Sequence, residues 1–346
     1  MTVFFMESVM KSRECDPSTE FYILTSRSAD ALRPLIADHP RIRVIDVAWK
    51  ERGALANLFL RCLRLPALVI TQQTFGRIAT SVKVLGKILS LRPDSTLAGF
   101  DDASRFNKYI YTRLVHFDSQ QLFYTAMLEL ARTTGFSVKS GVPQLSLSTS
   151  AQTLEKHSLQ TVEYVIIAPY AAAAHRSMPP SMIQSVIQEV RAIDPNIVVV
   201  LTGDKRQQDN LNGVIQKHLV DRDSSEQKYV RNPGILSLVE LATLIQHSRL
   251  YIGVDTGTTH LAAVMHKPSL VLENNSNPCW WPTYNERAVI LTNNEHCTCD
   301  GKKGGNCRVE RDGQMYYRCL SEVSDEKIRS SIGSLLQGDS GRTIAI

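Results

Sequence analysis

The sequence predicts an α/β protein with two doubly wound, Rossmann-like domains. Short apolar runs alternate with stretches of helical periodicity in two series, over residues 21–135 and 164–273. This alternation is typical of parallel sheets that are covered by helices on both faces. A length of 346 residues favours two domains over one. Residues 137–160, between the two series, are rich in Ser, Gln and Thr and indicate a linker.

The first series predicts an N-terminal domain over residues 1–145, followed by the linker at 146–160. The order of its elements, strand then helix, predicts parallel strands. The β-rich runs predict strands over 21–25, 43–47, 67–71 and 96–99. The remaining segments predict helices over 29–37, 76–89 and 123–134.

The second series predicts a C-terminal domain over residues 161–295. Its first helix, predicted over 180–193, has one apolar face at the i, i+3, i+4, i+7 spacing. The residues of this face are Ile183, Val186, Ile187 and Val190. Ser237 and Glu240 have the spacing of a capping box, which predicts the start of a helix over 238–246. The other predicted elements are strands over 164–167, 197–201, 250–254 and 269–273 and a helix over 258–266.

The composition is ordinary for a globular protein, with 43% apolar and 21% charged residues. The net charge is +5 without a block of five or six like charges, so we expect no nucleic-acid binding. A weak attraction to an anionic membrane face or an anionic glycolipid fits this charge better. The sequence has neither a run of about 18 apolar residues nor the pattern of a signal peptide. We therefore expect a cytoplasmic location.

The most informative segment is 251–263, where a short apolar run ends in Asp255-Thr256-Gly257 and small residues follow. This layout predicts a strand that leads directly into the start of a helix. Unpaired backbone N–H groups and the helix dipole favour anions there, above all phosphate. Ligands of doubly wound sheets bind at the carboxyl ends of the strands, so two such domains face to face would form a ligand cleft.

The sequence DTGTTHLAA at 255–263 resembles the Asp-Thr-Gly-x-Ser/Thr-His-Leu-Ala-Ala signature of glycosyltransferase family 9, the lipopolysaccharide heptosyltransferases. The segment HRSMP at 175–179 is similar to the family's Lys/Arg-x-Trp-Pro, and 201–204 and 236–238 match two further family positions. The resemblance is strong over 160–330 and weaker over 20–135. It implies a GT-B fold, in which two Rossmann-like domains enclose a cleft.

The resemblance also implies roles for individual residues. Arg176 would face the donor phosphates, where a guanidinium can neutralise the leaving diphosphate. Asp204 and Leu236 would lie near the nucleoside, although Asp204 could instead be a turn residue. His260 could be a core histidine as readily as a ligand-binding one. The turn that would bind the donor diphosphate and sugar consists of Asp255, Thr256, Gly257, Thr258, Thr259 and His260.

Within this turn, the backbone N–H groups of Thr256, Gly257 and Thr258 would serve the phosphates. Gly257 has no Cβ to keep a phosphate at a distance. Asp255 is an anion, so a sugar hydroxyl is its expected partner.

The reaction implied by the resemblance is inverting sugar transfer to a lipopolysaccharide core or related glycan. The expected sugar is heptose, with ADP-heptose as the donor. We expect an anionic glycolipid acceptor and peripheral contact with the inner face of the bacterial inner membrane. No cofactor is expected for catalysis. Two alternatives stay open. One is a non-catalytic relative that binds a nucleotide-sugar or glycan, and the other is a non-hydrolysing sugar epimerase, which shares the fold.

Family members begin with a strand and a Gly-Asp loop whose Asp is the presumed catalytic base. This chain reaches its first clear strand at 21–25, so we expect that the first strand and its Asp are missing and that the true start lies upstream. Residues 2–6 as the missing strand are the alternative. Asp101 and Asp102 are substitute candidates for the base, or residues of an ordinary loop turn.

A cysteine-rich arm is predicted over 296–320, followed by a C-terminal helix and tail over 321–346. The Asp312-Gly313 turn and the residues after it predict a β-arm. Four thiolates at this spacing could bind a structural zinc ion, or four reduced cysteines could pack a small loop. The seven cysteines of the chain are an odd number, which argues against a disulfide framework. The four cysteines of the arm are Cys297, Cys299, Cys307 and Cys319.

Overall fold

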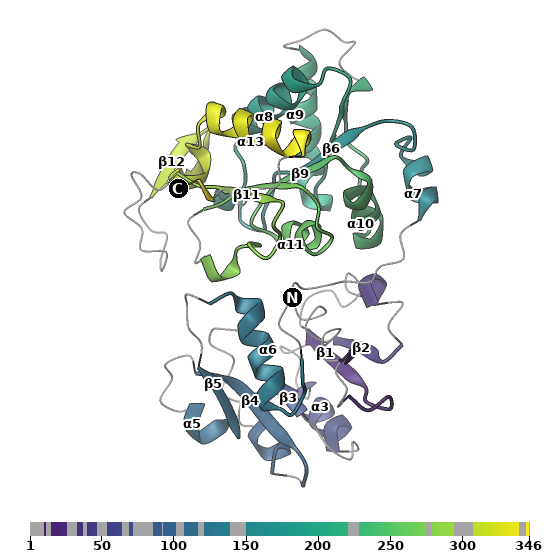
Figure 1. Cartoon of the computed structure of the whole chain (residues 1–346), viewed down its shortest axis with the longest axis vertical. Coiled ribbons are helices and arrows are strands. Elements are labelled where there is room, and N and C mark those ends of the chain that lie inside the picture. The colour runs from purple at the N-terminus through teal and green to yellow at the C-terminus, as the bar shows by residue number, and fades with distance from the viewer. Residues whose placement is uncertain are drawn as a thin grey trace. The chain divides into compact units, whose positions relative to one another are not determined.

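The computed structural model divides the chain into two compact units, Met1–Ser146 and Leu147–Ile346. Figure 1 shows the helices and strands of each unit. The structure describes residues 10–11, 15–25, 33–36, 40–46, 54–63, 69–71, 86–91, 93–101, 107–116, 121–138, 150–220, 228–274, 278–293, 307–338 and 344–345.

The second unit is built on a seven-stranded sheet in which every described strand pair is parallel. The strand order is β14-β11-β10-β9-β6-β7-β8. The central strands are almost wholly apolar because both faces of the sheet are covered. The strands are β6 (Tyr164–Ala168), β7 (Val198–Leu201), β8 (Val230–Arg231), β9 (Leu250–Val254), β10 (Ser269–Leu272), β11 (Ala288–Leu291) and β14 (Ile344–Ala345).

Helices cover both faces of this sheet (Figure 1). One core joins the sheet to α8 (Pro180–Ile193), α9 (Gln208–Val220) and α13 (Asp325–Gln337). The other face packs against α10 (Leu238–His247) and α11 (Gly257–Val264). The apolar face predicted for α8 is confirmed, since Ile183, Val186, Ile187 and Val190 are fully buried.

The predicted capping box of α10 is also present. The Ser237 hydroxyl accepts a hydrogen bond from the Glu240 N–H, and Glu240 Oε2 accepts one from the Ser237 N–H at 2.8 Å. The linker expected at 146–160 contains a helix, α7 (Ala151–Lys156), which sequence reasoning missed. This short helix packs on α10, and Lys156 pairs with Glu240 at 2.5 Å. Tertiary contacts therefore stabilise a segment whose own sequence indicates a helix only weakly.

The predicted β-arm is an antiparallel hairpin of β12 (Arg308–Arg311) and β13 (Gln314–Tyr317). Its turn residues Asp312 and Gly313 both have positive φ, 50° and 75°, as a two-residue hairpin turn requires. A short helix, α12 (Arg318–Ser321), follows and leads into α13.

The described residues of the first unit form two small parallel sheets. One pairs β1 (Phe21–Thr25) with β2 (Ile42–Asp46), and the other has β4 (Thr96–Asp101) between β3 (Val69–Thr71) and β5 (Arg113–His116). The predicted helix over 123–134 is α6 (Phe123–Thr133), whose apolar side is buried. Sequence reasoning missed β5, α3 (Ala54–Leu63) and α5 (Asn107–Ile110).

Several expectations for the first unit fall wholly or partly outside the described residues. Of the helix predicted over 29–37, only Arg33–Ile36 is described, as a single 3-10 turn. Of the helix predicted over 76–89, residues 86–89 are described and helical. The alternative first strand at 2–6 lies outside the described residues. In the part of the chain that the structure describes, no helix is long and apolar enough to span a bilayer.

Candidate functional site

The sheet of the second unit has a topological switch point between β6 and β9. The chain passes from β6 to β7 on one side and later places β9 on the other side. Loops that leave neighbouring strands in opposite directions open a crevice at the carboxyl edge of such a sheet. The loop after β6 carries Arg176, and the turn after β9 carries Asp255.

Arg176 and Asp255 form an ion pair across this switch point. The Arg176 Nη2 donates to Asp255 Oδ2 at 2.6 Å, although the two residues are 79 positions apart in the sequence. The Asp255 side chain is 15% exposed and that of Arg176 is 37% exposed. Burial raises the pKa of the Asp255 carboxyl, and the Arg176 guanidinium opposes that rise. The structure therefore brings together the two residues that the sequence placed in the same site.

The loop that carries Arg176 is fixed by its own hydrogen bonds. The Met178 N–H donates to the Pro169 carbonyl at 2.8 Å, which closes the loop at its base. The buried Ser177 hydroxyl accepts from the Ala171 N–H at 2.9 Å. The Arg176 N–H donates to the Ala173 carbonyl at 3.0 Å. These bonds set the position from which the guanidinium reaches Asp255.

The hairpin supports the same loop from outside. The Tyr317 ring meets His175 edge to face, with ring centroids 4.8 Å apart. Asp312, in the hairpin turn, accepts a hydrogen bond at 2.9 Å from the N–H of Ser181, in the first turn of α8. The N-cap position of α8 is Pro179, which offers no side-chain acceptor, so Asp312 supplies the missing cap.

The start of α11 is open to a ligand. Thr256 occupies the N-cap position, but its side chain does not cap this helix. The N–H groups of a first helical turn have no partner within the helix. A Cβ built on Gly257 would meet no atom within 4 Å, so the space above this residue is free. The turn can therefore present N–H groups to an anion.

His260 is half-buried and lies beside Tyr284. Its Nδ1 is 3.0 Å from the Tyr284 hydroxyl, and the two rings are stacked. Burial lowers the pKa of His260 to about 4, so the imidazole is neutral at physiological pH.

Asp204 caps the turn that follows β7. Its carboxylate accepts from the Arg206 N–H at 2.8 Å and pairs with the Arg206 guanidinium at 2.6 Å. Gln208 connects this turn to the loop after β8, since its amide donates to the carbonyls of Gly203 and Gly234. Leu236, half-buried, lies in that same loop before α10. The two residues expected near the nucleoside thus belong to two loops that Gln208 joins.

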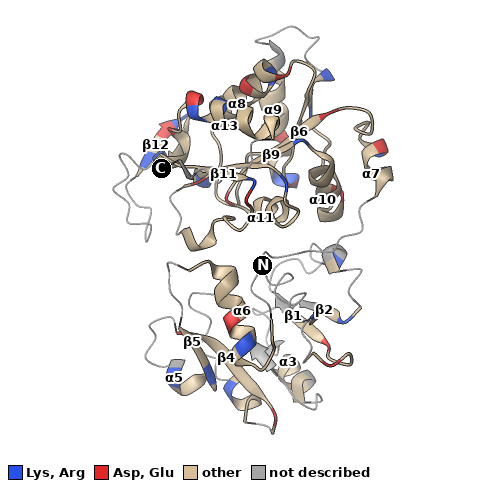
Figure 2. Ribbon diagram, in the orientation of Figure 1, with Lys and Arg blue, Asp and Glu red and all other residues tan. Residues whose placement is uncertain are grey.

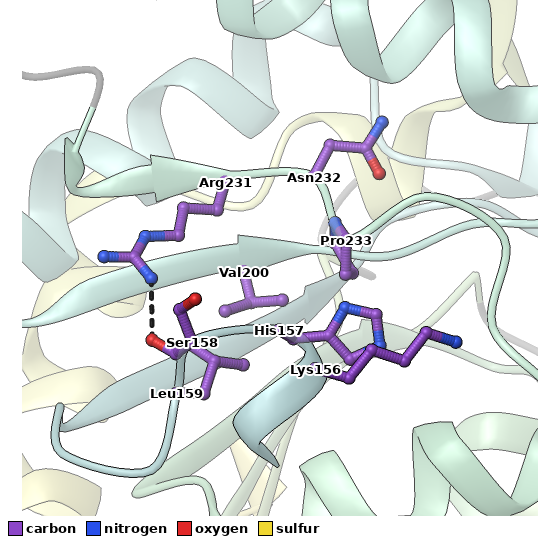
Figure 3. Close-up of a pocket in the computed structure, with 8 residues that line it drawn as sticks. All are labelled: Lys156, His157, Ser158, Leu159, Val200, Arg231, Asn232 and Pro233. Carbon is purple, nitrogen blue, oxygen red and sulfur yellow. Dashed lines mark hydrogen bonds between the residues drawn. The ribbon is translucent and has the colours of Figure 1, made fainter. Parts of the chain in front are cut away.

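A separate pocket of about 260 Å³ lies beside β7 and β8 (Figure 3). Its basic residues already have partners, since Lys156 pairs with Glu240 and Arg231 donates to the Ser158 carbonyl at 3.0 Å. The His157 Nε2 atom is buried without a hydrogen bond, and burial lowers the pKa of this imidazole. None of the lining residues belongs to the predicted donor set. They are Lys156, His157, Ser158, Leu159, Val200, Arg231, Asn232 and Pro233.

The remaining predicted site residues are only partly described. Asp101 ends β4 in the first unit and is exposed, whereas Asp102 lies outside the described residues. Cys307 and Cys319 are buried at the base of the hairpin, and Cys297 and Cys299 lie outside the described residues. Among the residues that the structure describes, no three His, Cys, Asp or Glu side chains form a metal-binding cluster. The zinc site therefore stays a prediction.

Sequence reasoning missed several residues around this site. Tyr251, fully buried in β9, contacts the hydroxyls of Thr258 and Thr259 in the turn after this strand. Tyr317 contacts the Arg176 loop through His175. Asp312 contacts the first turn of α8. Tyr284 contacts His260. Only Tyr251 left a local signal, a polar-tipped residue two positions before a glycine within an apolar strand.

Lys, Arg, Asp and Glu residues are interspersed around α8, α13 and β12 of the second unit (Figure 2).

Known proteins are similar to this chain over most of its length. The model of glycosyltransferase family 9 (heptosyltransferase) matches residues 88–308. Lipopolysaccharide heptosyltransferase 3 of Escherichia coli is 22% identical over 272 residues, which cover 74% of this chain and 76% of that protein.

Solved structures show the same fold. The E. coli ADP-heptose lipopolysaccharide heptosyltransferase II has a TM-score of 0.68 at 17% identity, with 96% of this chain and 93% of that chain covered. The E. coli heptosyltransferase WaaC with ADP has a TM-score of 0.64 at 16% identity, with 96% of each chain covered. These similarities establish the predicted GT-B fold. The chain belongs to glycosyltransferase family 9, the heptosyltransferase family.

Proposed function

We propose that the chain is an inverting transferase that moves heptose from ADP-heptose to a lipopolysaccharide core or a related anionic glycolipid. The observation that carries this proposal is the Arg176–Asp255 pair at the switch point, next to the uncapped start of α11. A cation, an anion and free N–H groups there match a donor with a diphosphate and a hydroxyl-rich sugar.

Each part of the donor has a proposed partner. The first-turn N–H groups at Gly257 and Thr258 bind the diphosphate, and Arg176 neutralises the charge that builds up on the leaving ADP. Asp255 accepts a hydrogen bond from a sugar hydroxyl. The loops of Asp204 and Leu236 flank the nucleoside. WaaC, a neighbour of the same fold, is known with ADP, which supports a nucleoside diphosphate as part of the donor.

The acceptor hydroxyl attacks the anomeric carbon while a carboxylate removes its proton. Within the sequence, Asp101 and Asp102 are our candidates for that carboxylate. The mildly basic chain, with a net charge of +5, fits an anionic acceptor. We place the reaction in the cytoplasm, with the protein at the inner face of the bacterial inner membrane.

A transfer assay tests the proposal. The full chain is incubated with ADP-heptose and heptose-acceptor lipopolysaccharide core, and the extended glycan is detected by mass spectrometry. Arg176→Ala should lower the rate of transfer by about 100-fold or more, because oxyanion-type stabilisation is worth that much. Arg206→Ala, which removes an exposed arginine of the neighbouring loop, is the matched control and should change the rate little.

The alternative outcomes are distinct. ADP binding by calorimetry without transfer would favour a non-catalytic nucleotide-sugar-binding protein. Equal loss in the Arg176 and Arg206 variants would contradict the assignment of Arg176 to the donor phosphates.

A further inference from the structure

Tyr251 lies beneath the donor turn and reaches it with its hydroxyl. The residue is fully buried in β9, and its Oη is 2.8 Å from Thr258 Oγ1 and 3.2 Å from Thr259 Oγ1. A Cβ at Gly253 would lie 2.6 Å from the Tyr251 Oη, so the glycine gives the ring the space to lie along the strand. Burial raises the pKa of Tyr251, so it is a neutral hydroxyl that can both donate and accept.

Two further contacts extend these, so that four hydroxyl contacts connect Tyr251, the threonines of the turn and the Val254 carbonyl. Thr259 Oγ1 donates to the Val254 carbonyl at 2.5 Å, and Thr256 Oγ1 is 2.9 Å from Thr258 Oγ1. A carbonyl only accepts, so the direction of the series is fixed at Val254. With this direction fixed, only one assignment of the four hydroxyl protons satisfies all four contacts. Each donor precedes its acceptor in the order Thr256, Thr258, Tyr251, Thr259, Val254.

This arrangement explains why α11 is uncapped. A threonine at the N-cap position normally accepts from an N–H of the first turn. Here the contact with the Thr258 hydroxyl, which Tyr251 holds from below, fixes the Thr256 side chain in an orientation in which its oxygen makes no hydrogen bond to an N–H of the first turn. The N–H groups of the first turn consequently have no partner in the Thr256 side chain.

We infer that Tyr251 is the positioning residue of the donor turn. It anchors the hydroxyl series that keeps Thr256 from capping α11 and leaves the helix start free for phosphate. Because the proton of Thr256 is used within the series, its oxygen offers only lone pairs to a ligand. Thr256 is therefore an acceptor for a sugar hydroxyl, and not a donor to phosphate. This inference rests on the proposed donor role of the turn.

The first test compares Tyr251→Phe with Tyr164→Phe. Tyr164 is a matched control, since it is also fully buried in a central strand and its hydroxyl donates to a helix carbonyl, that of Leu244, at 2.7 Å. We expect Tyr251→Phe to weaken ADP binding by about fivefold or more in calorimetry, whereas Tyr164→Phe leaves it unchanged. Both variants should lose similar thermal stability.

Equal ADP affinity in Tyr251→Phe and the unmodified protein would overturn the inference. If Tyr251→Phe does not fold, Thr258→Val replaces it, because that residue lies at the turn and not in the core. Thr258→Val should weaken ADP binding as Tyr251→Phe does, and Thr258→Ser, which keeps the hydroxyl, should restore it. Equal affinity for Val and Ser would overturn the inference. An unmodified protein that binds no ADP would refute the proposed function and this inference with it.

The second test concerns the direction of the hydrogen bonds. Thr256→Val should weaken binding of ADP-heptose by about fivefold and leave ADP binding unchanged, because only the sugar uses the Thr256 oxygen. Thr256→Ser should behave like the unmodified protein toward both ligands. Equal weakening of ADP and ADP-heptose binding by Thr256→Val would mean that the hydroxyl donates to phosphate, and it would overturn the assigned direction.

Discussion

Among the described residues of the second unit, two Asp–Arg pairs lie at the carboxyl edge of the sheet, and they differ in sequence separation and in burial. Asp255 and Arg176 come from different loops, and the aspartate is 15% exposed. Asp204 and Arg206 are two residues apart, with side chains 44% and 77% exposed. Both pairs have an N···O distance of 2.6 Å.

This difference distinguishes a pair that joins two loops at a candidate ligand site from a pair that only caps its own turn. The Asp204–Arg206 pair forms within one turn, where water screens the charges and the carboxylate already satisfies backbone N–H groups. The Asp255–Arg176 pair forms only when β6 and β9 lie side by side, and it keeps two charges in a partly desolvated place. Desolvation strengthens the electrostatic interaction of those charges with a bound anion or hydroxyl.

The largest expected effect comes from breaking the pair at the switch point. We expect Asp255→Ala to weaken ADP-heptose binding by at least about thirtyfold, because truncating one partner of a buried charged pair costs about 2–5 kcal/mol. Asp204→Ala should change that affinity by less than about threefold, since it removes a cap from an exposed turn. Calorimetric titration of both variants with ADP-heptose gives the comparison. Equal losses would show that the two pairs do not differ as their burial indicates.

A second prediction uses His260, which lies on the same helix as the donor turn. Its folded-state pKa is about 4, against about 6.5 for an unfolded chain. As pH falls below 6.5, His260 binds a proton in the unfolded chain but not in the folded protein. The free energy of unfolding therefore decreases between pH 6.5 and pH 4, by at most about 3 kcal/mol, and this contribution is constant above that range.

Urea unfolding at several pH values checks this dependence, with His260→Gln as the comparison. The Gln variant has no imidazole to protonate, so its free energy of unfolding should fall less steeply over the same range. Identical slopes for both proteins would exclude His260 as the source. His247, a histidine on α10 with its Nδ1 2.9 Å from the Thr243 carbonyl, offers a control position.

The smallest expected effect concerns Asp312, which acts as a cap as Asp204 does. It differs from Asp204 because it caps a helix 131 residues away in the sequence. We expect Asp312→Ala to cost about 0.5–2 kcal/mol of stability and to lower the melting temperature by a few degrees. Because the cap lies next to the Arg176 loop, the rate of sugar transfer should fall as well.

Asp312→Asn is the control for this change. Asparagine tolerates the positive φ of 50° at this turn, so the hairpin is kept while the charge is removed. We expect its melting temperature to lie between those of the unmodified protein and the Ala variant. A loss of stability in Asp312→Ala without any loss of transfer would show that the cap does not act through the Arg176 loop.

Much of the fold could be predicted from local patterns. The strands at 164–168 and 250–254 and the helix Pro180–Ile193 follow from apolar runs and periodicity, and the structure has them at nearly the predicted bounds. The helix α7 could not be predicted, because six residues carry little propensity and its stability comes from packing on α10. The strand β5 was missed for a similar reason, since three of its four residues are exposed.

For the candidate site, the sequence alone determined the family, the Asp255–His260 turn and the presence of Arg176, because these are local motifs at a strand end. Only the tertiary structure decided that Arg176 pairs with Asp255, that Asp204 caps its own turn and that Tyr251 supports the donor turn. For the Arg176–Asp255 pair the physical reason is the range of the contact, 79 positions along the chain, and for the two local contacts it is the orientation and burial of the side chains. Strand pairing and burial bring distant residues together, and no spacing along the chain encodes which of two chemically identical pairs is desolvated.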